Sequence, residues 1–199
     1  MANVSRVNGL NPIKNVVGAS NVGQVNLFFI PSGNAVNTFV GDPVKADATG
    51  DTVAAGGKAL GIQSVVQAAA GDAQIGVVVG FLVDPANLNT PQYRAASTGR
   101  YVLVADDPNT IYEVQTSNGT LTAADVGLNA NIAVAAGSTT TGTSGVTLDA
   151  GTVATTATLP LKIVGFSQRV DNEVGNANAK VLVKINNHQF NSGTGTAGV

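Results

Sequence analysis

The hydrophobic residues of this chain occur in short runs, and turn-forming residues separate these runs at intervals of about ten residues. The runs are rich in valine and isoleucine, and they lack the repeat of an amphipathic helix. This pattern predicts an all-β fold, either a β-sandwich or a small barrel, jelly-roll-like or related. The expected strands are Val25–Ile30, Val36–Val40, Leu60–Gln67, Gly76–Val83, Arg100–Ala105, Ile111–Gln115, Asn131–Ala135, Gly145–Leu148, Leu159–Gln168 and Ala179–Ile185.

Turn chemistry supports these boundaries. Proline fixes φ, and a neighbouring aspartate or asparagine can hydrogen-bond its own backbone, so the two together end a strand sharply. At most one short helix is expected, at Thr122–Val126, where Thr122 and Asp125 have the spacing of a capping box. The proline turns are Gly41-Asp42-Pro43, Asp84-Pro85 and Asp106-Asp107-Pro108-Asn109.

We expect a single β-domain over residues 25–190, because a chain of 199 residues can bury one core and needs no second one. Residues 1–24 combine asparagines with isolated apolar residues, which predicts an extended N-terminal arm whose apolar side chains need an external pocket. Residues 191–199 are rich in glycine, serine and threonine, which predicts a flexible C-terminal tail. The low-complexity stretch 137–145 is expected to be an exposed loop.

Charged residues make up 11% of the chain, less than half of the roughly 25% that is typical of soluble domains. Several strands, above all Gly76–Val83, are apolar at consecutive positions, so both of their faces must be covered. Large exposed apolar surfaces usually mark contacts with other proteins. Composition and pattern therefore favour a chain that docks along other proteins over a monomeric domain.

The net charge of −2, without a run of like charges, argues against direct nucleic-acid binding. The longest apolar stretch, Ile75–Val83, has about half the length of a membrane-spanning helix, so no membrane association is expected. The start of the chain does not resemble a signal peptide, which predicts synthesis in the cytoplasm. The absence of cysteine excludes disulfides, thiolate metal sites and a cysteine nucleophile.

We expect no catalytic site, cofactor or metal. His188, the only histidine, follows a strand and lies next to the tail, which favours a hydrogen-bonding role at a surface or interface. Gly57-Lys58-Ala59 lacks the other residues of a P-loop, and a turn explains Asp106-Asp107 better than a calcium site does. The carboxylates that a glycoside hydrolase would need are Asp84, Asp106, Asp107, Glu113, Asp171 and Glu173, and several of these aspartates belong to turns.

The order of several segments resembles the head decoration, or cement, proteins of tailed bacteriophages with short tails. The resemblance runs over nearly the whole chain, and no catalytic signature contributes to it. The segments that carry it are Gly9-Leu10-Asn11-Pro12, Gly41-Asp42-Pro43-Val44, Leu60-Gly61-Ile62, Phe81 to Asn89, Val104 to Asn109, Tyr112-Glu113-Val114-Gln115, Leu121 to Gly127 and Val183 to Phe190.

This resemblance implies a β-fold on the outer surface of the virion's icosahedral head, made in the cytoplasm of the host bacterium. Its partners would be the major capsid protein and further copies of itself, as a dimer or trimer, with the trimer slightly favoured. The arm would lie along capsid subunits or an adjacent copy, and its deletion would leave the β-domain folded. The expected capsid or oligomer interface residues are Leu10, Pro12, Ile13, Val16, Val17, His188 and Phe190.

Two other functions remain as alternatives. A receptor- or glycan-binding tail or fibre module would usually show more aromatic residues than the 5% present here, together with a fibrous stem. A carboxylate-based glycan hydrolase is the other alternative, and it would need two of the acidic residues named above to face one another.

Overall fold

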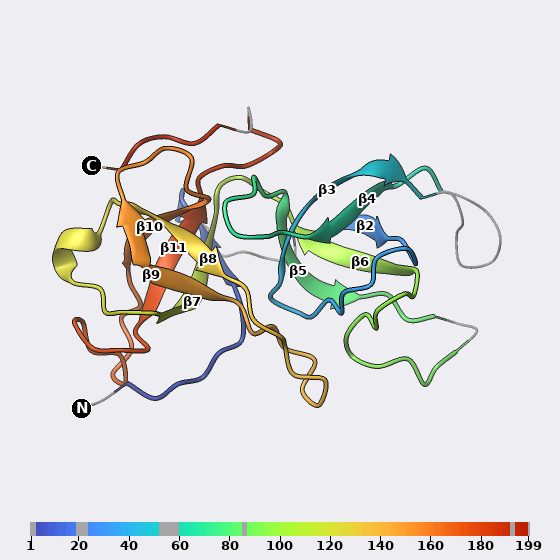
Figure 1. The fold of residues 1–199 in the computed structure, drawn as a ribbon, viewed down its shortest axis with the longest axis horizontal. Coiled ribbons are helices and arrows are strands. Elements are labelled where there is room, and N and C mark those ends of the chain that lie inside the picture. Colours follow the sequence, from blue (N-terminus) through green and yellow to red (C-terminus); the bar gives the residue numbers. More distant parts are fainter. Residues whose placement is uncertain (1–2, 19–23, 52–59, 85–86, 192–193, 199) are drawn as a thin grey trace.

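The chain forms two β-barrels side by side in the computed structural model, which describes residues 3–18, 24–51, 60–84, 87–191 and 194–198 (Figure 1). The first barrel is closed in the order β2-β4-β3-β5-β6, and its strands are β2 (Asn26–Ile30), β3 (Pro43–Gly50), β4 (Gln63–Gln67), β5 (Gly76–Phe81) and β6 (Arg100–Ala105).

The second barrel is a six-stranded sheet in the order β1-β7-β11-β10-β8-β9, in which β7 also pairs with β9. This extra pairing closes five of the strands into a ring and leaves β1 on the outer edge of β7. The strands are β1 (Asn11–Asn15), β7 (Thr110–Ser117), β8 (Asn129–Ala133), β9 (Thr147–Ala154), β10 (Leu161–Phe166) and β11 (Lys180–Ile185).

Each barrel has its own hydrophobic core, and the strand pair β5–β6 contributes to both. Val78 and Val104 belong to the core of the first barrel, whereas the adjacent Val77 and Ala105 pack into the core of the second barrel. Successive side chains of a strand point to opposite faces, so a strand between two cores must be apolar at consecutive positions. The apolar run in β5 is therefore covered on both faces within this chain, by its own barrel and by the other one.

The all-β prediction is confirmed, and a short helix, η1 (Ala123–Asp125), lies in the segment where one was expected. The Thr122 N–H donates to the Asp125 carboxylate at 2.7 Å, as the capping-box spacing predicted. The expected strand Val36–Val40 is wrong, because it makes only isolated bridges, from Thr38 to Arg94 and from Val40 to Thr143.

The prediction of an arm that reaches outward is wrong for residues 9–15. Leu10 is completely buried in the core of the second barrel, and Asn11–Asn15 pairs antiparallel with β7. Residues 1–2 and 19–23 of the expected arm lie outside the described residues. The sequence around Leu10 shows no periodic pattern that would indicate burial. Its pocket is formed by side chains that are distant in the sequence.

Two glycines allow the N-terminal segment to cross the first barrel at close range. Gly9 and Gly41 both have positive φ, at 72° and 94°, and the Leu10 N–H donates to the Gly41 carbonyl at 3.0 Å. A Cβ on Gly41 would lie 2.4 Å from the Asn8 carbonyl oxygen, closer than real side chains approach. The backbones can meet here only because neither glycine carries a side chain.

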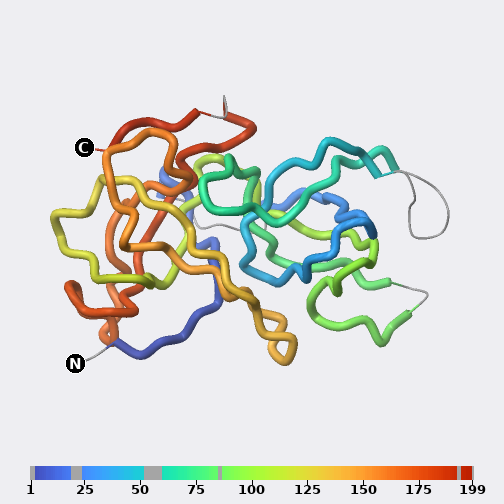
Figure 2. The backbone as a smooth tube through the Cα atoms, in the orientation of Figure 1, coloured from blue at the N-terminus to red at the C-terminus, as the bar shows by residue number. Residues whose placement is uncertain are grey.

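The expected loop 137–145 connects the two barrels (Figure 2). The prediction of an exposed loop therefore holds for only part of it. The segment leaves β8, reaches the first barrel and returns to β9. There the Val40 N–H donates to the Gly142 carbonyl at 3.0 Å, and the Ser144 N–H donates to the Val40 carbonyl at 2.8 Å. Gly142 and Ser144 are buried in this contact.

The C-terminal segment is also tied to the second barrel. The Thr196 N–H donates to the Asn186 side chain at 3.0 Å, and the Gly198 N–H donates to the Thr155 carbonyl at 3.0 Å. The Asn129 side chain donates to the Thr196 carbonyl at 2.7 Å. Residues 194–198 therefore differ from the expected flexible tail, while 192–193 and 199 lie outside the described residues.

Candidate interaction surfaces

The residues expected at an interface fall into a buried group and an exposed group. Leu10 and His188 are only 0% and 1% exposed, so neither offers a free surface to a partner. For both, the expected interface role is replaced by a role in packing this chain. Pro12 is partly buried, whereas Ile13, Val16, Val17 and Phe190 are exposed.

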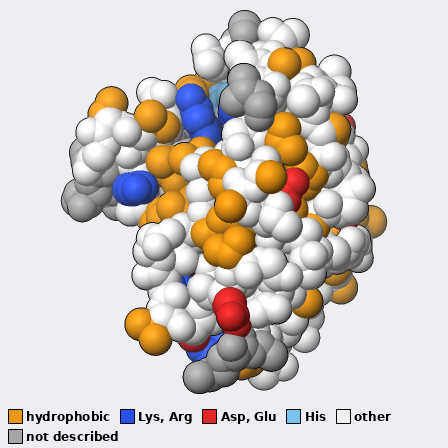
Figure 3. Space-filling view, turned by 90° about the vertical axis from the view of Figure 1, so that its left-hand side faces the viewer, with side chains coloured by type: hydrophobic (Ala, Val, Ile, Leu, Met, Phe, Trp, Pro, Cys, Tyr) orange, Lys and Arg blue, Asp and Glu red, His pale blue; other side chains and the backbone are white. Residues whose placement is uncertain are grey.

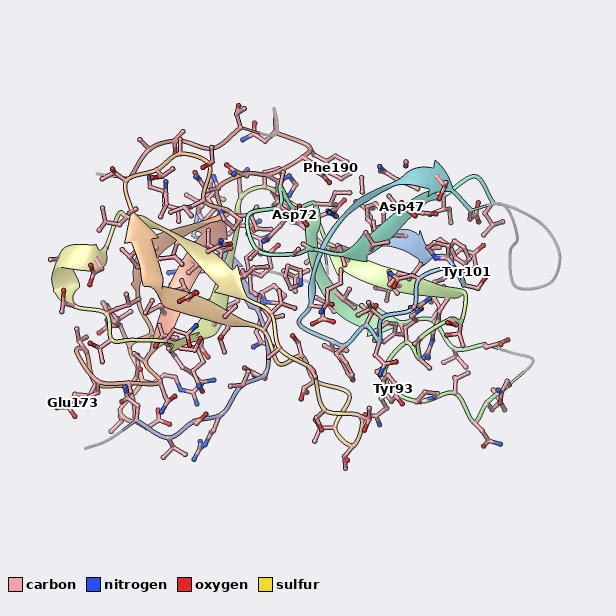
Figure 4. The ribbon with its side chains drawn as sticks, viewed as in Figure 1. Asp47, Asp72, Tyr93, Tyr101, Glu173 and Phe190 are labelled. Carbon is pink, nitrogen blue, oxygen red and sulfur yellow. The ribbon has the colours of Figure 1, made fainter. Side chains whose placement is uncertain are left out.

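The exposed members do not form one surface. Ile13, Val16 and Val17 belong to the segment on the β7 edge of the second barrel. Phe190 instead lies at the junction of the barrels (Figure 4), where its ring stacks on Phe28 with the centroids 6.4 Å apart.

His188 helps to join the two barrels. The Gln74 N–H donates to the Asn187 carbonyl, and the Gln189 N–H donates to the Gln74 carbonyl, both at 2.8 Å, so His188 pairs with Gln74 across the junction. The His188 Nδ1 accepts a hydrogen bond from the Phe190 N–H at 3.2 Å. Burial lowers the pKa of His188, although the nearby Asp106 carboxylate acts in the opposite direction. The imidazole is therefore neutral at pH 7.

The candidate catalytic carboxylates each have local partners. The Asn26 side chain donates to both carboxylate oxygens of Asp106, at 3.0 and 2.9 Å. Glu113, on β7, accepts a hydrogen bond from Ser167 and lies 3.3 Å from the Arg169 guanidinium. Within the described ranges, no three His, Asp or Glu side chains gather in a way that could hold a metal ion.

Two buried charged groups stabilise loops of the first barrel. Arg94 is fully buried and donates to the carbonyl oxygens of Pro31, Asn34, Val36 and Thr98 at 2.6 to 2.8 Å. Burial lowers the pKa of the Arg94 guanidinium to about 10, so it remains charged at neutral pH. This cation thus holds the segment after β2 against the segment before β6.

Asp42 is the second of these groups, and it lies where the N-terminal segment crosses the barrel. Its carboxylate accepts a hydrogen bond from the Phe39 N–H at 2.8 Å. Burial raises the pKa of Asp42, and the hydrogen bonds oppose this effect only in part.

At the far end of the first barrel, Tyr101 donates to the Asp51 carboxylate at 2.7 Å (Figure 4). Burial and this negatively charged partner raise the pKa of Tyr101 to about 12. Burial on its own would raise the pKa of Asp51, but the hydrogen bonds from Tyr101 and from the Leu60 and Ile62 N–H groups hold it below the usual value. The hydroxyl and carboxylate therefore form a structural pair.

We compared the chain with family models, curated proteins and solved structures. None of the three comparisons found a match. In the part of the chain that the structure describes, no helix has the length and apolar character needed to cross a membrane.

An open groove of about 920 Å³ lies between the two barrels, and we call it the inter-barrel groove. The first barrel contributes the segment after β2 that includes Val36, Lys45 and Asp47 of β3, and the end of β4 with the following residues 68–70, while the second contributes Ile132–Val134 and Asp149. In the sequence, Ala68-Ala69-Ala70 and Ala133-Val134 are runs of small apolar residues, and such runs alone do not distinguish a groove from a core.

Large apolar side chains are exposed on both barrels. Val170, Val17 and Leu88 are the most exposed, at 110%, 82% and 78%. At the end of the molecule formed by the second barrel, hydrophobic side chains gather near the middle of the face and charged ones are few (Figure 3). The other exposed members are Val4, Val7, Ile13, Val16, Val36, Leu60, Leu82, Val83, Val126, Val134, Val164, Val174 and Phe190.

Proposed function

We propose that this chain is a structural virion protein that decorates the outer surface of the mature icosahedral head of a tailed bacteriophage. In this role it cements neighbouring copies of the major capsid protein and associates with further copies of itself, as a trimer in preference to a dimer. The exposed apolar surface on both barrels, combined with only 11% charged residues, is the observation that carries the proposal. Such a surface indicates contact with other proteins.

The connections between the two barrels support a role in transmitting force between capsid subunits. Three separate backbone contacts join the barrels: Leu10 to Gly41, segment 137–145 to Val40, and Gln74 to His188. The shared strand pair β5–β6 adds a continuous hydrophobic connection. A cement protein has to transmit force between capsid subunits, and a body with several independent connections resists bending between its parts.

Mass action explains how binding of the chain would stabilise the head. A protein that binds only the assembled, expanded shell stabilises that state in proportion to its occupancy. Several docking points on each oligomer convert modest contacts into high avidity without any single strong site. The resemblance of the sequence segments to head decoration proteins provides the choice of partner.

The proposal is tested by co-sedimentation of the purified chain with phage heads that lack it, in the unexpanded and the expanded form. We expect saturable binding to expanded heads and much weaker binding to unexpanded ones, because the docking surface is assembled on expansion. If the chain binds neither unexpanded nor expanded heads, the proposed function is refuted.

A further inference from the structure

The inter-barrel groove has the shape and charge to accept an extended, basic and apolar segment. Four alanines are among its lining residues, together with Val36 and Val134, which are 50% and 44% exposed. Lys45 is bound to Asp72 at 2.8 Å, so it is not available to balance the other carboxylates. Among the described residues, no cation forms an ion pair with Asp47 or Asp149, which leaves the groove with excess negative charge.

The N-terminal part of this chain has the complementary chemistry. No acidic residue precedes Asp42, whereas Arg6 and Lys14 are both present. Val4 and Val7 are exposed at 61% and 37%. Because successive side chains of an extended segment alternate, these two valines point to opposite sides and can each contact one wall of a groove.

Within its own copy, the start of this segment is held by polar contacts, one of which is the hydrogen bond from the Arg6 N–H to the side chain of the buried Gln115 at 2.6 Å. Asn3 exchanges hydrogen bonds with the Glu173 backbone at 3.0 and 2.8 Å, and Arg6 lies 3.8 Å from Asp171 with both side chains mostly exposed. Glu173 lies at the outer end of the second barrel, well away from Asp47 on β3 of the first barrel (Figure 4). Residues 3–7 can therefore leave this position while the buried Gly9 and Leu10 still anchor them, and an extended stretch of this length spans about 17 Å.

We propose that the inter-barrel groove binds residues 3–7 of a second copy of this chain in an extended conformation. Val4 and Val7 contact the two apolar walls, and Arg6 lies beside Asp47 and Asp149. The inference deepens the proposed function, because such an exchange of N-terminal segments links neighbouring copies on a surface. Residues 3–7 combine a basic side chain with two exposed valines, which matches the charge and the apolar lining of the groove.

Engineered disulfides test this arrangement directly, because the chain contains no cysteine. A Val4→Cys variant is mixed with a Val134→Cys variant, and formation of the mixed disulfide dimer is followed over time under mild oxidation. The control pairs Val4→Cys with Leu88→Cys, whose site is more exposed than Val134 but lies outside the groove. We expect the groove pair to link about tenfold faster, because docking raises the local concentration of the two thiols.

Charge exchange provides the second arm of the test. Asp47→Lys together with Asp149→Lys in the Val134→Cys copy should slow linking to the rate of the control pair. Arg6→Glu in the Val4→Cys copy should then restore much of the lost rate, since the two charges attract again. High salt should weaken both effects.

Equal linking rates for the groove pair and the control pair would overturn the inference. An intrachain disulfide in a single chain carrying both Val4→Cys and Val134→Cys would also overturn it, since the segment would then occupy its own groove. The melting temperature of each variant confirms that its fold is intact. The experiment needs no capsid, so its failure is distinguishable from a failure of the proposed head binding.

Discussion

Arg94 shows how a single residue can determine the arrangement of a loop. Its guanidinium donates to four backbone carbonyls, and these carbonyls would be left without donors if the side chain were removed. We expect Arg94→Met to lower the free energy of unfolding by about 3 kcal/mol or more, measured by urea denaturation. Lys14→Met, which removes an exposed cation, is the matched control and should change it by less than about 0.5 kcal/mol. A comparable loss in both variants would contradict the role of Arg94.

His188 should make stability depend on pH in a definite direction. Its pKa in the folded chain lies below the ordinary value of 6.5, so the unfolded chain binds a proton more readily. The stability contributed by the neutral form is complete above that value and is lost as the pH falls from about 6.5 through the lower pKa of the folded chain.

The measurement compares the wild type with His188→Gln by urea denaturation between pH 8 and pH 5. Because the chain has one histidine, the difference between the two proteins isolates its titration. The wild type should lose stability relative to the variant as the pH falls. A difference that stays constant with pH, or that grows in favour of the wild type, would show that the side chain is not held neutral by burial.

At the scale of elements, the crossing of the N-terminal segment over Gly41 is a point of close contact. Gly41→Ala places a Cβ 2.4 Å from the Asn8 carbonyl oxygen, and Gly71→Ala places one in open space, although both glycines have positive φ. Both variants carry backbone strain of about 1 kcal/mol, and only Gly41→Ala adds the clash. Thermal unfolding should therefore show a larger loss for Gly41→Ala. Equal losses would indicate that the crossing is not close in solution.

The N-terminal segment itself should divide into a dispensable and an essential part. A chain that lacks residues 1–7 keeps Leu10 and β1, so its stability should remain close to that of the full chain. A chain that lacks residues 1–17 loses a fully buried leucine and the pairing with β7, which should cost about 3 kcal/mol or more. Urea denaturation of both chains measures this. A long deletion as stable as the short one would restore the idea of an independent arm.

The sequence predicted strands well where burial on one or both faces produced a clear apolar run. Arg100–Ala105 has the bounds that the pattern predicted, and Ala179–Ile185 differs by one residue at its start. β3 was missed because only Pro43 and Val44 of its eight residues are buried, and its remaining residues are small or polar. β1 was missed because a five-residue edge strand with a proline and two asparagines has no hydrophobic pattern.

The sequence predicted that apolar residues would be exposed, but it predicted only some of them correctly. Exposed apolar residues in the N-terminal segment were expected, and Val16 and Val17 are indeed exposed. Leu10 and His188 are instead buried, because segments far away in the sequence cover them. The inter-barrel groove depends on how the two barrels are placed relative to each other, and local sequence patterns do not predict that placement.

At the scale of the whole molecule, the two-barrel fold explains where the many apolar residues of this weakly charged chain are placed. Part of the apolar excess is used inside the chain, since β5 and β6 serve two cores. The remainder is exposed on both barrels, where the proposed function assigns it to contacts with capsid protein and with other copies. In the proposed function, binding to the capsid and to other copies is distributed over many small contacts, and no single residue is decisive.

The most direct test of this account is the temperature at which expanded heads release their DNA, measured with and without saturating amounts of the purified chain. Binding that bridges neighbouring capsid subunits stabilises the assembled shell by mass action. We expect a higher release temperature in the presence of the chain, and the increase should follow its occupancy on the heads. An unchanged release temperature on fully occupied heads would contradict the cementing role.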